Sequence, residues 1–280
     1  IKDFKINKSE IDYISLSGQT IIHKPEKKIS IQLGSGKNIS NKLGINIVYD
    51  FRKNDIKNGG QGAPIGAFYN KFISEKLKKN FLFINIGGIS NICFANKKKL
   101  IAFDVGPGNC LIDDYIWIKK RKKFDNNGAI SLRGKINKKI INEFLKDKYF
   151  KKKYPKSLDR QYFNNYIKKC KKLSLKDGLS TLSMMTVYSI KMGIEEINEK
   201  IDKIILSGGG RKNKFFVDNL KKILKINIIK IDNIGKNGDL FEAEAFAYIA
   251  ARSINNLPIS LKSTTGVKRP TTGGNIYKIK

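Results

Sequence analysis

The segment 103–109, with the sequence Phe-Asp-Val-Gly-Pro-Gly-Asn, places one carboxylate beside a rigid turn. The apolar run 100–103 predicts a buried strand, and the Gly-Pro-Gly that follows predicts the end of that strand. Asn109 is a residue type that caps helices, and 110–120 is expected to be helical. Asp104 is therefore expected where a strand gives way to a helix, a place where α/β proteins hold ligands. The alternative is that Asp104 only hydrogen-bonds local backbone, as Asp often does beside turns.

A glycine pair lies between two apolar runs that are expected to be strands. Gly87 and Gly88 let the backbone approach an anion closely, and a hairpin turn can present several N–H groups together. This pattern is compatible with a phosphate-binding hairpin. It is equally compatible with a plain hairpin turn, for which a Gly-Gly pair is sufficient.

A triple glycine follows the expected strand 203–206 and precedes an expected helix. The end of a strand next to a helix N-terminus is favourable for anions. Gly208, Gly209 and Gly210 exceed what a turn needs and leave room for a flat base or a sugar. Arg211 lies next in the chain, where it could contact a phosphate or cover a purine. The alternative for this segment is a flexible connector.

The composition predicts a globular protein of one large or two ordinary domains. The chain has 280 residues, of which 40% are hydrophobic and 10% aromatic. Its net charge of +32 is compatible with nucleic-acid binding. However, the lysines are spread over nearly all segments, and Ile and Asn are abundant too, which indicates an A/T-rich genome rather than a binding patch. The lysines are therefore expected to form a solvated surface, without a nucleic-acid partner.

Three cysteines without CxxC spacing fit reduced thiols in a cytoplasm better than a disulfide framework. The single His23 excludes a His-rich metal site. No apolar run has the length of about 20 residues that spans a bilayer, and no signal peptide is visible. A cytoplasmic protein without membrane contact is expected.

The periodicity predicts strands and helices in an order typical of an α/β protein. Three strands linked by short turns suggest an antiparallel meander, and alternation of strands and helices in the second half predicts an α/β layer. The domain boundary is expected near Asn80, giving domains 1–79 and 80–280, with the last residues able to return to the first. The expected strands are 11–16, 43–48, 81–86, 89–95, 100–103, 203–206 and 226–231. The expected helices are 65–78, 110–120, 136–149, 175–200, 213–224 and 240–254.

Seven groups of residues, in the same order along almost the whole chain, resemble the anhydro-N-acetylmuramic acid kinase family of the sugar kinase/Hsp70/actin superfamily. Each group alone is weak, but the shared order makes the resemblance specific. The groups are 17–25; 50–52 with Asp55 and 59–64; 85–91; 103–109; Lys156 and Ser157 with Arg160 and Phe163; 207–213; and 242–247.

The resemblance implies a two-lobe α/β ATPase fold with a central cleft. It also implies a reaction with ATP and Mg²⁺, in which water opens the 1,6-anhydro bond of the amino sugar and O6 is phosphorylated. The product, N-acetylmuramic acid 6-phosphate, belongs to peptidoglycan recycling. Asp104 matches the general base, because a carboxylate within hydrogen-bond reach can activate water. The family also suggests a homodimer.

Further site residues follow from the resemblance. The expected nucleotide-binding residues are Gly87, Gly88, Ser90, Asn91, Gly208, Gly209, Gly210 and Arg211. The expected sugar-binding residues are Gln19, Gln61, Gly62, Ala63, Gly108, Asn109 and Glu244. For Glu244, a solvated or capping carboxylate on a helix is an equal alternative.

Two departures from the family pattern affect these expectations. The family's first phosphate loop, a Gly-Thr-Ser-x-Asp-Gly-x-Asp segment, is not found in the 280 residues. We therefore expect that an N-terminal segment of the first lobe is missing and that this polypeptide alone is a poor kinase. Ser17 stands where the family usually has His, which could weaken sugar binding.

Two other functions remain open from the sequence. Another sugar kinase of the superfamily would keep the loop 208–210 but would not need a water-activating base at Asp104. A nonenzymatic basic protein that binds nucleic acid would show steep salt dependence and would tolerate Asp104→Asn.

Overall fold

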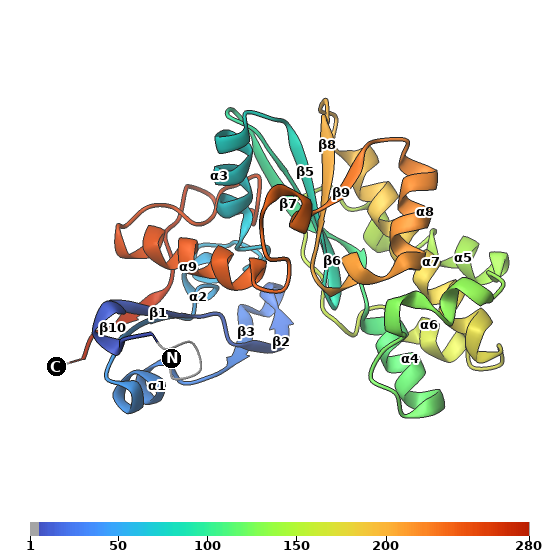
Figure 1. The fold of residues 1–280 in the computed structure, drawn as a ribbon, viewed down its shortest axis with the longest axis horizontal. Helices are drawn as coiled ribbons and strands as arrows, with labels where there is room; N and C mark the ends of the chain where they lie inside the picture. The colour runs from blue at the N-terminus through green and yellow to red at the C-terminus, as the bar shows by residue number, and fades with distance from the viewer. Residues whose placement is uncertain (1–5, 280) are drawn as a thin grey trace. The chain divides into compact units, whose positions relative to one another are not determined.

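The computed structural model describes residues 6–279. Two compact units make up the chain: one contains the residues up to Tyr69 together with those from Glu242 onward, and the other contains 70–241 (Figure 1). The division between the units falls just before Asn70, whereas the sequence placed the domain boundary near Asn80. The assignment of domains remains a prediction.

A five-stranded sheet forms the centre of the second unit, with the strand order β7-β6-β5-β8-β9. Strands β5 (Phe81–Ile86), β6 (Ile89–Ala95) and β7 (Leu100–Pro107) pair as the predicted antiparallel meander. Strands β8 (Lys203–Ser207) and β9 (Ile228–Lys230) run parallel to β5. The meander and the α/β layer expected from the sequence are both confirmed.

Alternation along these strands separates two faces of the sheet. One face carries buried aliphatic and aromatic side chains, including Leu82, Ile84, Ile92, Phe103 and Leu206. Helices α4 (Cys110–Lys120), α7 (Leu175–Glu196) and α8 (Lys214–Leu224) contribute to the same core (Figure 1). Each fully buried Leu, Ile or Phe side chain contributes roughly 1.5–3 kcal/mol to folding, so this face holds the unit together.

Short helices complete the second unit beside α4 and α7. Helices α5 (Lys138–Phe144) and α6 (Asn165–Lys169) lie in a region dense in aromatic rings. The ring of Phe144 lies 5.0 Å from that of Phe163 and 5.2 Å from that of Tyr166. The expected helix 136–149 is thus shorter than predicted, and its last residues form a 3-10 turn over Lys148–Lys151.

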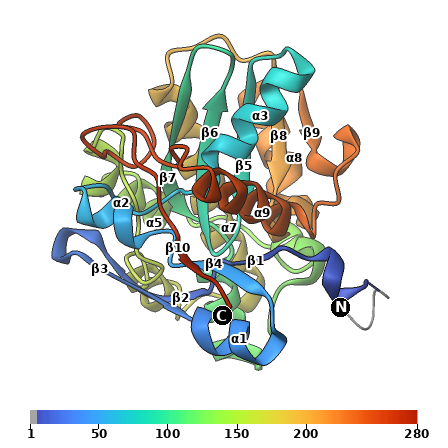
Figure 2. The same cartoon turned by 90° about the vertical axis from the view of Figure 1, so that its left-hand side faces the viewer.

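The first unit contains a three-stranded sheet of order β1-β4-β10 and a separate hairpin (Figure 2). Its strands are β1 (Tyr13–Leu16), β4 (Asn46–Tyr49) and β10 (Asn275–Tyr277), and the hairpin pairs β2 (Gln19–Lys24) with β3 (Ile29–Leu33). Its helices are α1 (Gly36–Leu43), α2 (Lys53–Lys57), α9 (Phe241–Ile254) and α3 (Ala67–Leu77), the last of which continues into the second unit. Buried Val48, Phe51, Ile65, Ile249 and Ile259 form its core.

Helix α1 is not predicted from the sequence because it is short and mostly polar, with Ile39 and Leu43 as its apolar residues. Its ends nevertheless carry standard signals: the Ser35 side chain accepts a hydrogen bond from the Asn38 N–H at 3.3 Å, and Gly44 ends the helix in the left-handed conformation. The hairpin β2–β3 was also not predicted as strands. The capping signals, together with the i, i+4 spacing of Ile39 and Leu43, could have revealed helix α1.

The prediction that the strand 100–103 ends just before Asp104 is wrong. Strand β7 continues to Pro107, so Asp104 lies inside the strand rather than at its exit. Proline is tolerated there because β7 is an edge strand, where a missing N–H breaks no sheet bond on the open side. The helix 110–120 is confirmed, but the Asn109 side chain makes no capping hydrogen bond.

Candidate active site

Four polar side chains lie in a row across the second face of the sheet. Asn85 of β5 pairs in register with Asn91 of β6 on one side and with Ser207 of β8 on the other. Asn91 in turn pairs with Asp104 of β7. Residues in register on neighbouring strands project from the same face. The row therefore lies opposite the aliphatic face, near the carboxyl ends of β5, β7 and β8, where open α/β sheets bind ligands.

Asp104 is held by hydrogen bonds on its side chain and on both backbone groups. Its Oδ2 accepts from the N–H of Leu158 at 2.9 Å, and its own N–H donates to the Lys156 carbonyl at 3.0 Å. Its carbonyl accepts from the Tyr149 hydroxyl at 2.6 Å. Only 5% of Asp104 is exposed. The carboxylate is thus oriented by chain segments distant in sequence.

The predicted glycine hairpin and the Gly-Pro-Gly turn are bonded to each other. The carbonyl of Gly88 accepts from the N–H of Gly108 at 2.9 Å and from that of Cys110 at 3.1 Å, and the Asn109 N–H donates to Gly87 O at 2.7 Å. A Cβ on Gly108 would lie 2.2 Å from Gly87 O, so only glycine permits this approach. These two predicted motifs form one rigid structure beside the polar row.

The Asn109 side chain strengthens this junction instead of capping α4. Its Nδ2 donates to the carbonyls of Ile86 at 3.1 Å and of Gly87 at 2.9 Å. Ser90, predicted to bind nucleotide, is fully buried and donates to Pro107 O at 3.2 Å. Both side chains therefore shape the hairpin, whereas the half-buried Asn91 belongs to the polar row.

The triple glycine has two constrained positions and one open position. Gly208 has a φ of +74°, and a Cβ there would lie 2.5 Å from Asn85 Oδ1. A Cβ on Gly210 would lie 2.3 Å from Ile86 Cγ2, because this residue packs against β5. A Cβ on exposed Gly209 would have no atom within 4 Å, and the same holds for Gly88. Packing inside the protein explains Gly208 and Gly210 but not Gly88 and Gly209.

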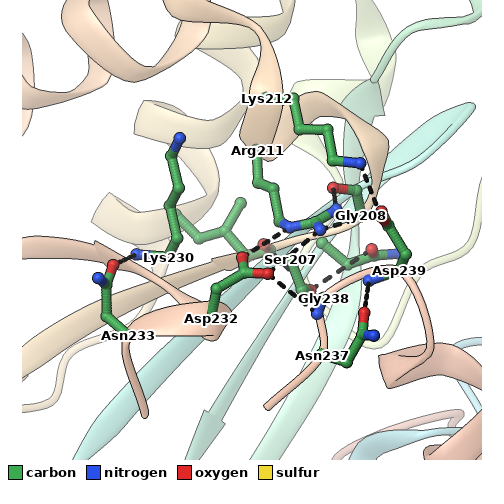
Figure 3. Close-up of polar contacts among 12 residues, drawn as sticks. Ser207, Gly208, Arg211, Lys212, Lys230, Asp232, Asn233, Asn237, Gly238 and Asp239 are labelled. Atoms are coloured by element: carbon green, nitrogen blue, oxygen red, sulfur yellow. Dashed lines mark hydrogen bonds and ion pairs between the residues drawn. The ribbon is translucent and has the colours of Figure 1, made fainter. Parts of the chain in front are cut away.

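Arg211 joins the glycine loop to the loop after β9 (Figure 3). Its Nε donates to Asp232 Oδ2 at 2.9 Å, its Nη2 to Asp239 Oδ1 at 3.0 Å, and its Nη1 to the Gly208 carbonyl at 3.2 Å. The side chain is 4% exposed. A Cβ on Gly238 would lie 2.2 Å from Arg211 Nε, so a glycine is needed where the guanidinium passes. These hydrogen bonds indicate that Arg211 stabilises the glycine loop by connecting it to Asp232 and Asp239.

The ion pairs of Arg211 alter the pKa of its partners. The hydrogen bond from Arg211 lowers the pKa of Asp232 to about 2, and Lys212 followed by Arg211 lowers the pKa of Asp239. Both carboxylates thus stay ionised at neutral pH and keep the two loops joined.

The loop containing Gln61, Gly62 and Ala63 is organised by Asp55 in the first unit. The Gly62 N–H donates to Asp55 Oδ1 at 2.6 Å, and Thr265 Oγ1 donates to Asp55 Oδ2 at 2.5 Å. Asp55 is 1% exposed. Backbone atoms of Gln61 and Thr265 are also bonded, since the Gln61 N–H donates to Thr265 O at 2.6 Å. The loop is therefore fixed by a buried carboxylate.

The other two predicted sugar residues lie elsewhere in the first unit. Gln19 is an exposed residue of β2. Glu244 lies on α9, and its Oε2 accepts a hydrogen bond from the Tyr69 hydroxyl. Glu244 therefore has a structural partner in addition to its predicted sugar contact.

Sequence reasoning did not single out Asn85, Ser207 or Asp55 as site residues. Asn85 is the one polar residue of the strand 81–86, and Ser207 directly follows the aliphatic run 204–206. A polar residue within a buried strand indicates a specific role, because burial without a partner is unfavourable. The polar residues within buried strands can be seen in the sequence. The strand register that brings Asn85 into line with Asp104 cannot be seen there.

A family model described as anhydro-N-acetylmuramic acid kinase matches residues 1–279. The anhydro-N-acetylmuramic acid kinase of Brucella canis is 37% identical over 273 residues, covering 95% of this chain and 73% of the relative. That of Zymomonas mobilis is 36% identical over 285 residues, covering 100% of this chain and 78% of the relative.

Two solved structures show lower similarity. The activator of 2-hydroxyisocaproyl-CoA dehydratase from Clostridium difficile, with bound ADPNP, has a TM-score of 0.45 at 13% identity, covering 89% of this chain and 98% of that one. Ligand-bound xylulose kinase from Lactobacillus acidophilus has a TM-score of 0.41 at 12% identity, covering 89% of this chain and 51% of that one.

The chain is thus a kinase, a transferase of the carbohydrate type that uses ATP. It belongs to the anhydro-N-acetylmuramic acid kinase family. The predicted α/β fold class is confirmed by the mixed sheet and its helices. The nonenzymatic nucleic-acid-binding alternative is set aside, because the family is one of kinases.

Within residues 6–279, no three His, Cys, Asp or Glu side chains cluster in a way that could hold a metal ion. In the same part of the chain, no helix combines the length and apolar character needed to cross a bilayer.

Proposed function

We propose that this protein opens 1,6-anhydro-N-acetylmuramic acid with water and phosphorylates O6 with ATP. The product, N-acetylmuramic acid 6-phosphate, would enter peptidoglycan recycling. The observation that supports this most is the buried, oriented Asp104 carboxylate beside two glycine loops at the ligand-binding edge of the sheet. A cytoplasmic location and a homodimer remain predictions from the family resemblance.

In the proposed reaction Asp104 is the general base. Its carboxylate takes a proton from the water whose oxygen attacks C1 of the sugar, and the bond between C1 and O6 breaks. O6 then bonds to the γ-phosphorus of ATP while the bond to the β-phosphate oxygen breaks, releasing ADP. The hydrogen bond from Leu158 to Asp104 Oδ2 supports this role, because it fixes the carboxylate direction before substrate arrives.

The two open glycines are proposed to face the nucleotide. Neither Gly88 nor Gly209 has atoms of the protein near its Cβ position, so nothing in the fold demands glycine there. Close approach of a phosphate to Gly88 and of a ribose or base to Gly209 would explain both. Arg211 would act by bracing this loop rather than by touching ATP.

Mg²⁺ would be held at this site mainly by the phosphate oxygens of ATP. Magnesium usually keeps several waters and binds substrate phosphates with one or two carboxylates, so a dedicated protein cage is not needed. The side-chain carbonyl oxygens of Asn85 and Asn91 in the polar row are donors of the suitable type. When bound, the ion would neutralise charge on the transferred phosphate.

In the second unit, Gly108 and Asn109 are proposed sugar-binding residues on the family resemblance. In the first unit, Gln61, Gly62 and Ala63 are proposed on the same ground, and buried Asp55 fixes their loop through its hydrogen bond with the Gly62 N–H. Gln19 and Glu244 remain proposed contacts that rest on the family resemblance.

The test is a product assay by mass spectrometry on the complete product of the gene. The protein receives Mg-ATP and 1,6-anhydro-N-acetylmuramic acid, and Asp104→Asn is the matched variant. We expect a product heavier by one water and one phosphoryl group, with turnover reduced by about 10²–10⁴-fold in the variant and ATP binding retained. Unchanged sugar with a folded, ATP-binding protein would contradict the proposed substrate and point to another acceptor.

A further inference from the structure

We propose that Glu196 is a positioning residue for Asp104, acting through its buried ion pair with Lys156. This inference rests on the proposed role of Asp104 as general base. It assigns a function to a carboxylate that belongs to none of the groups of residues on which the family resemblance rests.

The ion pair is almost completely buried. Lys156 Nζ lies 2.8 Å from Glu196 Oε2, and the two side chains are 7% and 10% exposed. Lys156 Nζ also donates to the Lys152 carbonyl at 2.6 Å, and Glu196 Oε1 accepts from the Tyr154 N–H at 2.6 Å. Each carboxylate oxygen of Glu196 therefore has a donor, which a buried charge requires.

The location of Glu196 is unfavourable for helix stability. It is the last residue of the 22-residue helix α7, where the partial negative charge of the helix end repels a carboxylate. Replacing a buried ion pair by apolar residues is often neutral or stabilising. Neither helix stability nor the burial of the ion pair explains why residue 196 is a glutamate. A role in fixing the position of the segment 154–158 does explain it.

The segment 154–158 is hydrogen-bonded to both the backbone and the side chain of Asp104. Lys156 accepts through its carbonyl from the Asp104 N–H at 3.0 Å, and two residues later Leu158 donates its N–H to Asp104 Oδ2 at 2.9 Å. The segment thus lies along the open edge of β7 at the position of Asp104. Because Glu196 holds both Tyr154 and Lys156, it sets the position of the N–H group that orients the carboxylate.

Contacts with aromatic rings also hold the segment 154–158 next to Asp104. The Tyr154 ring stacks on that of Phe103, with centroids 5.0 Å apart and planes 10° apart. Lys156 Nζ lies 5.4 Å from the Phe103 centroid and 5.3 Å from that of Tyr149. Burial, followed by the charges of Asp104 and Glu196, raises the pKa of Tyr149 well above its ordinary value. Tyr149 therefore stays a hydroxyl that donates to Asp104 O.

The experiment compares two charge-neutral pair variants in the complete protein. Lys156→Met with Glu196→Gln removes both charges of the buried pair and keeps an acceptor for Tyr154. Lys191→Met with Glu195→Gln removes an exposed pair from the same helix and serves as the matched control. Thermal melting of each variant shows whether the protein is folded.

We expect the buried-pair variant to lower kcat about 10- to 100-fold while KM for ATP changes less than about twofold, because misplacement of the base affects the chemical step. The control is expected to match the wild type. A second variant, Glu196→Asp, keeps the charge but is too short to hold both Tyr154 and Lys156, and we expect a smaller loss of kcat. A wild-type kcat in the folded buried-pair variant, or a parallel rise in KM for ATP, would overturn the proposal.

If the buried-pair variant does not fold, the test rests on Glu196→Asp, and a wild-type kcat in this variant overturns the proposal.

The variant Asp104→Asn separates this inference from the proposed function. Full turnover in Asp104→Asn would show that the base assignment is wrong, whatever Glu196 does. If Asp104→Asn is slow, adding Glu196→Asp to it should cause no further loss, because Glu196 acts through Asp104. An additive loss would show that Glu196 acts by another route.

Discussion

Asn91 of β6 lies directly opposite Asp104 of β7, and the register shifts immediately beyond this pair. Ser90 pairs with Gly106 rather than with Val105, so Val105 has no partner on β6. Such a bulge re-aims the chain and is common next to active sites. Here it turns Gly106 toward α7, where a Cβ would lie 2.3 Å from Ser189 Oγ. The bulge thus fixes the exit of the chain just after the proposed base.

Replacing Gly106 by alanine is expected to destabilise the protein. The added Cβ meets Ser189 in a fully packed interior, and such overpacking typically costs about 1–3 kcal/mol of unfolding free energy. Urea denaturation of Gly106→Ala measures this loss. Gly88→Ala is the control, because its Cβ enters open space, and equal loss in both variants would contradict the assignment.

Alanine at Gly209 is expected to weaken nucleotide binding without affecting the fold. No protein atom lies within 4 Å of its Cβ position, so the methyl group would not disturb the fold, and a loss of binding would come from its contact with the nucleotide. We expect KM for ATP to rise about tenfold and the melting temperature to stay unchanged. In Gly208→Ala, by contrast, the positive φ and the contact with Asn85 should lower the melting temperature. An unchanged KM in Gly209→Ala would place the nucleotide elsewhere.

Arg211→Lys is expected to raise KM for ATP several-fold while kcat changes little. Lysine keeps the charge but loses the fork that joins Asp232, Asp239 and the Gly208 carbonyl. Steady-state kinetics with varied ATP measure the effect. Lys212→Met, which removes an exposed partner of Asp239, is the control. A loss confined to kcat would instead indicate contact with the transferred phosphate.

Asp113→Asn is expected to stabilise the protein at neutral pH but not in acid. Burial, with Asp114 as the second cause and Arg160 opposing, raises the pKa of Asp113 to about 6. Since the unfolded value is about 4, the folded state carries an unfavourable charge above about pH 6, and below about pH 4 both states are protonated. The melting temperature of the variant should exceed that of the wild type above pH 6, and the difference should vanish near pH 4. A constant difference across this range would contradict the role of charge.

Local patterns in the sequence were enough to predict the first two strands of the meander, helix 110–120 and the family. These features depend on local patterns: β5 and β6 are short apolar runs separated by Gly87 and Gly88, and the motif order depends on residue identity alone. Local propensity and turn chemistry act over a few residues, so they can be read without the fold.

How the site is assembled depends on contacts between residues far apart in the sequence. The strand through Asp104 extends beyond its predicted end because sheet pairing outweighs the turn signal of Gly106 and Pro107. Arg211 appeared free for a ligand, yet two aspartates from a later loop engage it. The contact between Glu196 and Lys156 joins residues 40 positions apart. Pairing over such distances depends on where packed elements meet, which no local pattern encodes.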